Sequence, residues 1–235
     1  MNFKHLLTHR LVVIKFNRKL ILASTSPRRQ FLLQELGFHF RIENPESDES
    51  FPNVMPAEAI PKFLAEQKAE TLKSTIKDEI VMTADTVVII DGGILNKPDD
   101  RHHAIEMLNC LSGRTHTVIT AVCLLDREKQ DVFDDHSRVT FKKLSQKEIE
   151  FYVDTCKPLD KAGAYGAQEC LPSGVNPCSH EEIKFLKEIN KMDLIEKSIN
   201  TKAGSGMACI EKITGSYFNV MGLPIHKVYE HLLSF

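Results

Sequence analysis

The apolar run EIVMTADTVVII, residues 79–90, constrains the fold more than any other stretch of the sequence. It is rich in β-branched residues and is followed by the turn Asp91-Gly92-Gly93, a combination typical of a buried strand. Asp85 stands in its middle, where a carboxylate loses hydration unless it finds a partner. We predict a buried central strand. Asp85 then either serves a functional site or is a strand-end residue that accepts hydrogen bonds from a neighbouring loop.

The remaining elements predict a mixed sheet in an α/β protein. Residues 117–125 and 132–141 have strand character and are joined by the charged turn DREKQD, a link too short for a parallel crossover. Shorter strands are expected at 20–23, 40–42 and 207–213. Apolar spacing and capping residues predict helices that begin near Ser26, Ala57, Asp99 or Asp100, Ser145, Ser179 and Pro224. Because strands and helices are interspersed, the class is α/β.

A segment of different character, residues 169–203, separates two of these core elements. Its first half is rich in turn residues, and its second half predicts a charged amphipathic helix that opens on the capping box Ser179/Glu182. The apolar positions Phe185, Ile189, Met192, Ile195 and Ile199 form one stripe of that helix. We interpret the segment as a helical insertion.

Two adjacent arginines occupy an unusual position in the stretch STSPRR. Ser26 is the expected N-cap and Pro27 the first helical residue, which places Arg28 and Arg29 in the first turn. A cation there is disfavoured by about 0.3–1 kcal/mol, because the helix N-terminus carries partial positive charge. The two side chains are therefore either simply solvated or bind an anion that the free backbone N–H groups help to hold. These residues alone leave both interpretations open.

Acidic and basic residues elsewhere favour an anion and a metal ion. Asp48 and Glu49 follow the first unit, and Lys68 and Lys97 flank the central strand in the sequence. Carboxylates that hold a divalent cation, with cations that neutralise phosphoryl oxygens, are what a phosphate and Mg²⁺ site requires. Each of these residues taken alone is equally compatible with a solvated surface.

Other chemistries lack support in the sequence. There is no G-x-S-x-G, H-E-x-x-H or P-loop motif, and His102 and His103 are adjacent on a helix and point apart. His116, which follows Arg114-Thr115, either contacts a ligand or is an edge residue at the start of a strand, and the second interpretation is preferred. The net charge of −2 gives no general attraction to nucleic acid or to an anionic membrane, and no apolar run approaches the roughly 20 residues of a membrane span.

The cysteines and the N-terminal stretch bear on the cellular compartment in which the protein is expected. Six cysteines without a C-x-x-C pair indicate free thiols in a reducing compartment, and a bridge between Cys170 and Cys178 is disfavoured. Residues 1–19 contain five Lys or Arg and no acid, which is compatible with an organelle transit peptide. The stretch has little serine and no cleavage pattern, so a simple N-terminal extension is the preferred interpretation.

Several motifs, taken in order, resemble the Maf family of nucleotide pyrophosphatases. They are LILASTSPRRQFLLQELG, SDES, TADTVVIIDGGILNKP, AIEMLNCLSGRTHTVITAV, PLDKAGAYGAQ and GSYFNVMGLPI, which cover about residues 20–168 and 204–235. The resemblance implies a domain over 20–235 with a fold like that of inosine triphosphate pyrophosphatases: an elongated mixed α/β sheet with flanking helices, in two lobes around a cleft. It also implies a cytoplasmic homodimer that cleaves a nucleoside triphosphate to a monophosphate and pyrophosphate with Mg²⁺ or Mn²⁺.

The same resemblance implies roles for individual residues. Asp85 would be the proton acceptor that activates water, or a group that acts through the metal, and Glu49 would share the metal with it. Arg28, Thr86 and Gln168 match positions linked to substrate choice. The positions that line the phosphate and metal site match Ser24, Arg29, Glu49, Lys68 and Lys97. The form of DKAGAYGAQ resembles the branch that acts on dTTP and UTP, and possibly on modified pyrimidine nucleotides, rather than the branch that acts on 7-methyl-GTP.

Two departures from the family pattern stand out. Asn96-Lys97-Pro98 replaces the usual GKP and keeps the lysine. The insertion at about 169–203 borders the proposed base pocket and forms a lid, an interface or a plain surface excursion. A different class of function is a nucleotide-binding regulator of septum formation that acts without turnover. Direct nucleic-acid binding has no basic face or aromatic stacking motif to support it.

Overall fold

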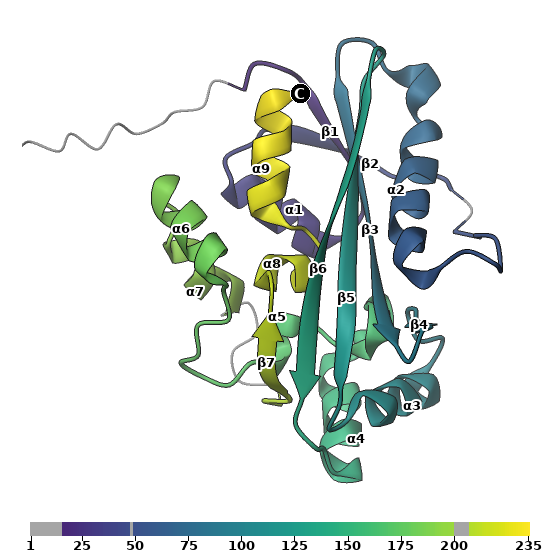
Figure 1. Cartoon of the computed structure of the whole chain (residues 1–235), viewed down its shortest axis with the longest axis vertical. Helices are drawn as coiled ribbons and strands as arrows, with labels where there is room; N and C mark the ends of the chain where they lie inside the picture. The colour runs from purple at the N-terminus through teal and green to yellow at the C-terminus, as the bar shows by residue number, and fades with distance from the viewer. Residues whose placement is uncertain (1–15, 48, 200–206) are drawn as a thin grey trace, which may run out of the picture.

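A mixed seven-stranded sheet forms the centre of the protein in a computed structural model that describes residues 16–47, 49–199 and 207–235 (Figure 1). Its strands lie in the order β2-β1-β3-β5-β6-β7, and β4 pairs with β3. Their bounds are β1 Leu20–Ala23, β2 Phe40–Glu43, β3 Ile80–Ile90, β4 Gly93–Leu95, β5 Thr115–Leu125, β6 Gln130–Phe141 and β7 Ile210–Thr214. The predicted α/β class with a mixed sheet is confirmed.

The pairing of β3 leaves a gap along one of its edges. β1 runs parallel to β3 and pairs only with 80–82, whereas β4 is antiparallel and pairs only with 88–90. On the other edge, β5 pairs with β3 continuously over 81–89. Among the described residues no strand therefore pairs with 83–87 on the first edge. We call this gap the notch, and Asp85 lies at its middle.

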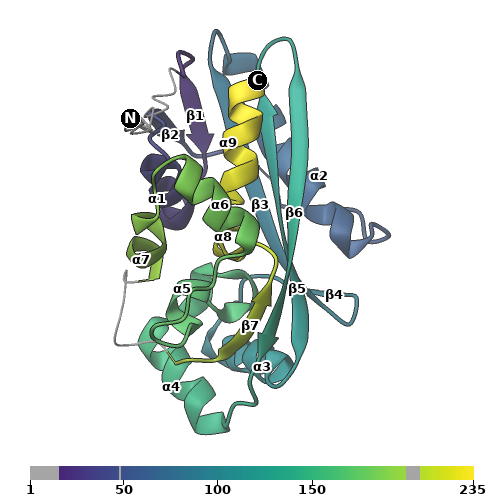
Figure 2. The same cartoon turned by 60° about the vertical axis from the view of Figure 1, so that its left-hand side comes forward.

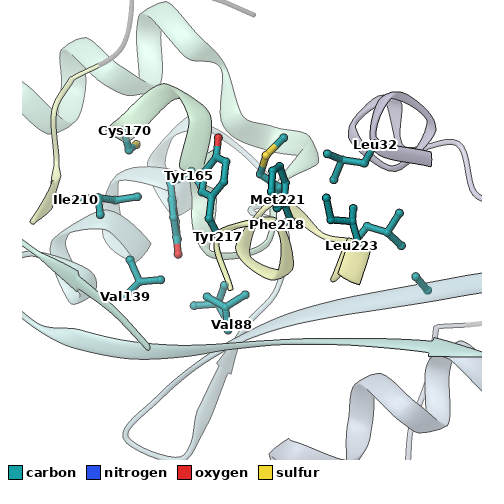
Figure 3. Packing of buried hydrophobic residues seen from close by; sticks show 14 of the residues in the cluster. Leu32, Val88, Val139, Tyr165, Cys170, Ile210, Tyr217, Phe218, Met221 and Leu223 are labelled. Atoms are coloured by element: carbon teal, nitrogen blue, oxygen red, sulfur yellow. The ribbon is translucent and has the colours of Figure 1, made fainter. Parts of the chain in front are cut away.

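Helices cover both faces of the sheet (Figures 1 and 2). On one face, α2 buries Ala65 and Ala69 against Val81 and Cys123. On the other, α8 and α9 pack over β3, β5 and β6, and Figure 3 shows Phe218 and Met221 of α8 near Val88. The α-helices are α1 Pro27–Glu35, α2 Ile60–Glu70, α3 Arg101–Leu111, α4 Gln146–Cys156, α5 Ala167–Cys170, α6 His180–Glu188, α7 Asp193–Ile199, α8 Tyr217–Met221 and α9 Ile225–Ser234, and the 3₁₀ turns are Ala57–Ala59, Lys73–Thr75, Pro158–Asp160 and Ala162–Ala164.

The helix starts follow the capping signals of the sequence. Pro27 is the first residue of α1 and Ser26 its N-cap, although the Ser26 hydroxyl accepts no hydrogen bond from the first turn in the described chain. The predicted capping box that opens α4 at Ser145 is formed, and so is the one that opens α6 at Ser179. Local side-chain to backbone hydrogen bonds decide these boundaries, which is why the sequence located them.

The single helix predicted after Ser179 is wrong, because the chain forms two helices there. Asn190 adopts φ 56°, the left-handed conformation that ends many helices. Lys191 N donates to Leu186 O at 2.8 Å and Asn190 N to Lys187 O at 3.2 Å, which is the Schellman pattern. The apolar stripe is shared by α6 and α7, so its spacing did not reveal the break. The short helices α5 and α8 were not predicted either.

Some expectations concern residues outside the described chain or only partly inside it. Residues 1–15 of the proposed N-terminal extension, Asp48, and residues 200–203 of the proposed insertion lie outside the described residues. All six cysteines are free thiols, Cys170 and Cys178 included. Within the described ranges, no helix has the length and apolarity needed to cross a bilayer.

His116 is not an edge residue, contrary to the sequence-based expectation. It lies near the start of β5, a central strand, and only 2% of it is exposed. Its Nε2 is 2.7 Å from the hydroxyl of Tyr165, and its ring also contacts Phe141. Burial lowers the pKa of His116 from 6.5 to about 4.

This depressed pKa predicts a pH dependence of stability. Between pH 6.5 and about 4 the unfolded chain binds a proton at His116 that the folded chain does not, so stability falls as the pH falls through this window. The loss amounts to about 3 kcal/mol at the acid end. We measure the free energy of unfolding of wild type and His116→Phe in urea from pH 7 to 4.5. The difference, wild type minus variant, should fall by about 3 kcal/mol as the pH is lowered. Phe141→Leu, which destabilises the same cluster without removing an ionisable group, should show a constant difference instead.

Candidate functional site

A cavity of about 570 Å³ opens at the notch of β3. Its walls come from the end of β1, the start of α1, the loop after β2, the last turns of α2 and the end of α8. The segment 160–168 closes the far side. The site residues expected from the sequence all line it: Ser24, Arg28, Arg29, Glu49, Lys68, Asp85, Thr86, Lys97 and Gln168. Positions far apart in the chain meet here because β1 stops at Ala23 while β3 continues.

The centre of the cavity is a lysine held between two carboxylates. Lys68 Nζ lies 2.6 Å from Asp85 Oδ1 and 2.9 Å from Glu49 Oε1. Lys68 reaches Asp85 because α2 crosses the face of β3 to which Asp85 points, and Thr83 fixes this crossing by donating from its hydroxyl to Ala65 O at 2.6 Å. Asp85 is thus a mid-strand residue paired with a cation. The alternative of a strand-end aspartate bound by a loop is wrong.

Burial and charge shift the acidities of this cluster in opposite directions. Burial raises the pKa of Asp85, and the positive charge of Lys68 only partly opposes this. Glu49 is more exposed: desolvation would raise its pKa, but the hydrogen bond and charge of Lys68, with Lys97 and Arg29, lower it. Two carboxylates on one lysine therefore differ in basicity, and Asp85 is the stronger base.

Arg29 is fixed in the wall of the cavity by four hydrogen bonds, and we call this arrangement the Arg29 clamp. Its guanidinium donates to Gly222 O at 2.9 Å, to Ala84 O at 2.8 Å, to Thr86 Oγ1 at 3.1 Å and to Ser24 Oγ at 3.3 Å. Ala84 O is a carbonyl of the notch, so Arg29 takes the place of a neighbouring strand there. These bonds occupy four of the five N–H groups of a guanidinium, which leaves one without a partner among the described residues. Burial lowers the pKa of Arg29, against the favourable charge of Asp85.

Arg28 has a different environment from Arg29. It is 3.4 Å from Asp160 Oδ2 at the rim of the cavity. Asp160 Oδ1 also accepts from Lys161 Nζ at 2.8 Å, and Lys161 lies 3.7 Å from Glu169. The two adjacent arginines therefore face different parts of the pocket, one fixed in its wall and the other at its rim.

The remaining expected residues have clear positions. Ser24 is buried and its Oγ accepts from Ser26 N at 3.3 Å, while Lys97 is exposed at the cavity mouth. Thr86 Oγ1 is also 2.9 Å from Thr120 Oγ1. Gln168 lines the cavity, and its Oε1 is buried and has no hydrogen-bond partner among the described residues.

Sequence reasoning missed part of the cavity. Lys161 and Asp160 belong to the glycine-rich stretch PLDKAGAYGAQ, whose mixture of charge and glycine was a usable signal. Gly222 carried no such signal, because its contribution is a backbone carbonyl at the end of a helix that the sequence did not predict.

The donor set suits a hard divalent cation together with a ligand. Glu49 and Asp85 supply carboxylate oxygens, and Mg²⁺ is commonly bound by one or two carboxylates plus phosphate oxygens of the substrate. No cluster of three or more His, Cys, Asp or Glu side chains fit for a metal occurs in the part of the chain that the structure describes. The residues present thus fit a cation that a phosphorylated ligand helps to hold. The cavity as a whole can take a polyanion, because it is lined by several cations and one basic carboxylate.

Comparison with known proteins identifies a family and similar proteins. Residues 19–181 match the family described as Maf-like protein. A dTTP/UTP pyrophosphatase of Bacteroides fragilis is 41% identical over 216 residues, which cover 91% of this chain and 94% of the relative. A dTTP/UTP pyrophosphatase of Porphyromonas gingivalis is 38% identical over 221 residues, with 92% and 94% covered. The Staphylococcus aureus Ham1 protein, a solved structure, is similar with a TM-score of 0.41 and 13% identity over 53% of this chain and 72% of that one.

The buried pair of Lys68 and Asp85 predicts strongly non-additive stabilities. Their side chains are only 11% and 12% exposed, and removal of one partner from such a pair costs about 3–5 kcal/mol because the other charge stays buried. We expect Lys68→Met to lose that amount and Lys68→Met/Asp85→Asn to recover most of it, as measured by urea unfolding at pH 7. Simple additivity of the two single variants would contradict a direct pairing.

Proposed function

The chain belongs to the Maf-like family, and from this premise we propose that it hydrolyses nucleoside triphosphates, dTTP and UTP above all, to the monophosphate and pyrophosphate. The observation that carries the proposal is the buried, basic Asp85 held by Lys68 beside the Arg29 clamp. Such a cavity offers a proton acceptor and a cationic bed for phosphates, which is what cleavage of a phosphoanhydride needs.

We assign the proton transfer to Asp85. The oxygen of a water molecule attacks the α-phosphorus, the bond from that phosphorus to the oxygen bridging the β-phosphate breaks, and pyrophosphate leaves with the electron pair. The proton of the water goes to Asp85. Since Lys68 contacts Oδ1, Oδ2 is the oxygen that we assign to this role. The raised pKa supports the assignment, because a general base works best with a pKa near the working pH.

We assign the phosphate oxygens to the cations around Asp85. Lys68, Lys97 and Arg29, which keeps one N–H without a partner among the described residues, all line the cavity. Ser24 also lines it, and its hydroxyl accepts from Arg29 at 3.3 Å. Positive charge fixed in advance around the reacting phosphorus stabilises the transition state without reorganisation.

A divalent cation, Mg²⁺ or Mn²⁺, is proposed at Glu49 and Asp85. These two carboxylates would hold it together with phosphate oxygens of the nucleotide. When bound, the cation neutralises phosphate charge.

We propose that the far side of the cavity selects the base. Gln168 lines the cavity and has an Oε1 without a partner among the described residues; turned toward the base, this oxygen would accept from the N3–H of uracil and thymine, a group that cytosine lacks. Arg28 at the rim and Thr86 in the wall border the same space. The names of the relatives support dTTP and UTP as preferred substrates.

The direct test is release of pyrophosphate across a panel of nucleotides, with Mg²⁺ and after EDTA treatment. We expect dTTP and UTP to be cleaved fastest and EDTA to abolish release.

Asp85→Asn should bind nucleotide but turn over at least a hundredfold more slowly, because the general base is lost. As the pH is lowered, Asp85 takes up a proton and the wild-type kcat/KM should fall. Because the pKa of Asp85 is raised, this fall should occur at a higher pH than the titration of an exposed aspartate. Nucleotide binding without turnover by the wild type would favour the alternative of a regulator.

The assignment of Gln168 has its own test. Gln168→Ala should lower kcat/KM for UTP by about tenfold, the worth of one neutral hydrogen bond, and should change cleavage of CTP little. Gln34→Ala, an exposed glutamine on α1, is the matched control and should leave both values unchanged. Equal losses on UTP and CTP would show that Gln168 does not recognise the base.

The homodimer, the cytoplasmic location and the lack of nucleic-acid binding remain predictions from the sequence. The same holds for an N-terminal extension over 1–19 and a helical insertion over 169–203. None of the steps above depends on them.

A further inference from the structure

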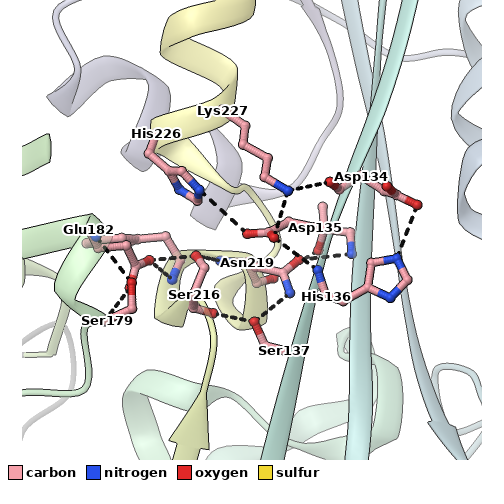
Figure 4. A network of polar contacts seen from close by, with 12 residues as sticks. Asp134, Asp135, His136, Ser137, Ser179, Glu182, Ser216, Asn219, His226 and Lys227 are labelled. Carbon is pink, nitrogen blue, oxygen red and sulfur yellow. Dashed lines mark hydrogen bonds and ion pairs between the residues drawn. The ribbon is translucent and has the colours of Figure 1, made fainter.

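Glu182 is a fully buried carboxylate between helix α6, which lies in the proposed insertion, and helix α8 of the core (Figure 4). Its Oε1 accepts from Ser216 Oγ at 2.6 Å and from Phe218 N at 3.0 Å. Its Oε2 accepts from Tyr217 N at 3.0 Å and from Ser179 N at 2.9 Å. Four donors thus converge on one carboxylate, and these bonds offset the cost of burying its charge.

The carboxylate joins two helix starts. In α6 it completes the capping box with Ser179. In α8 it accepts from the backbone of Tyr217 and Phe218, which are the first two residues of that helix and lack partners within it. A helix of five residues has little stability of its own. The start of α8 is therefore fixed from outside, by a side chain of α6.

Asn219 fixes the middle of α8 to the sheet. Its side chain accepts from Thr120 N at 3.0 Å and donates to Val118 O at 3.0 Å and to Ser137 Oγ at 2.9 Å. Ser137 Oγ in turn donates to Ser216 O at 2.8 Å. Figure 4 shows the contacts of Ser137 with Asn219 and Ser216 beside those of Glu182. Together they allow α8 little freedom to slide along β5 and β6.

The end of α8 forms the wall of the cavity. The helix stops at Gly222, with φ 109°, a conformation that favours glycine. The carbonyl of Gly222 is the acceptor for Arg29 Nε, and Val220, Met221 and Gly222 line the cavity. The position of α8 along its axis therefore fixes one of the four acceptors that hold Arg29.

We propose that Glu182 is a positioning residue for the phosphate side of the cavity, acting through α8 and Gly222 on Arg29. The inference rests on the proposed function. It gives the segment 169–203 a role other than a lid, an interface or a plain surface excursion: helix α6 supports the active-site wall from behind. Because Arg29 faces the nucleotide before and during the reaction, its displacement weakens binding of substrate and transition state alike, which raises KM and leaves kcat unchanged.

The test compares Glu182→Gln with Glu181→Gln. Glutamine keeps the size of Glu182 but turns one acceptor into a donor, which then opposes either two backbone N–H groups or the Ser216 hydroxyl and one N–H. Glu181 is the adjacent, exposed residue of α6 and loses the same charge. We expect Glu182→Gln to raise KM for UTP at least fivefold with kcat within twofold of wild type, and Glu181→Gln to change neither. Both are assayed well below their unfolding temperatures.

A second variant keeps the inference testable when Glu182→Gln does not fold. Ser216→Ala removes one donor to Glu182, and we expect KM to rise two- to threefold with kcat unchanged. The affinity for a UTP analogue with nitrogen between the α and β phosphates, measured by calorimetry, should fall by the same factors. An unchanged KM and affinity in folded Glu182→Gln, with only a lower unfolding temperature, would overturn the inference, as would a fall in kcat alone.

These readouts separate the two proposals. Failure of the wild type to release pyrophosphate would reject the proposed function, while the calorimetric comparison of the variants would still report on positioning. An active wild type with an unaltered Glu182→Gln would reject only the role of Glu182.

Discussion

The burial of Asp85 in the middle of β3 is the constraint on which the rest of the site depends. A carboxylate at that depth must be paired, and Lys68 of α2 supplies the pairing at 2.6 Å. The pair fixes where α2 crosses the sheet and leaves Asp85 more basic than an exposed aspartate. The contact with Lys68 thus allows the charge of Asp85 to be buried and also helps to set the basicity of Asp85. A substitution of Lys68 should therefore change both stability and activity.

Two of the buried carboxylates, Asp85 and Glu182, are satisfied in different ways. Asp85 is balanced mainly by a charge and lies in a cavity open to a ligand. Glu182 is balanced by four hydrogen-bond donors and has no exposed surface. Both oxygens of Glu182 are engaged by donors of the protein itself, so this residue is suited to hold structure. Asp85 keeps an oxygen for reaction, which explains how the two share one fold in distinct roles.

The arginines of α1 show how far sequence reasoning reached. Their place in the first turn predicted that they do not serve the helix, and the structure confirms that both bind groups outside it. The sequence did not reveal that most N–H groups of Arg29 are used by the protein itself. Those acceptors are mainly carbonyl and hydroxyl groups of β3 and of the end of α8, and backbone carbonyls carry no residue-specific signal. The sequence also did not predict the helix break at Asn190, because the apolar spacing continues across it. It did not predict the burial of His116, because that depends on which strands flank β5.

Local patterns in the sequence, namely apolar runs, helical spacing and side chains that bond within three residues, were enough to predict the α/β class, the main strands and the capped helix starts. The chemistry of the charged residues and the family resemblance pointed to most of the charged residues that line the cavity, but not to Asp160 and Lys161. Only the tertiary structure decided that β1 ends short of β3 and so opens the notch, that Lys68 lies between Asp85 and Glu49, and that α6 holds α8 through Glu182. Each of these depends on contacts between residues distant in the chain, whose geometry is fixed only when the sheet and its helices pack.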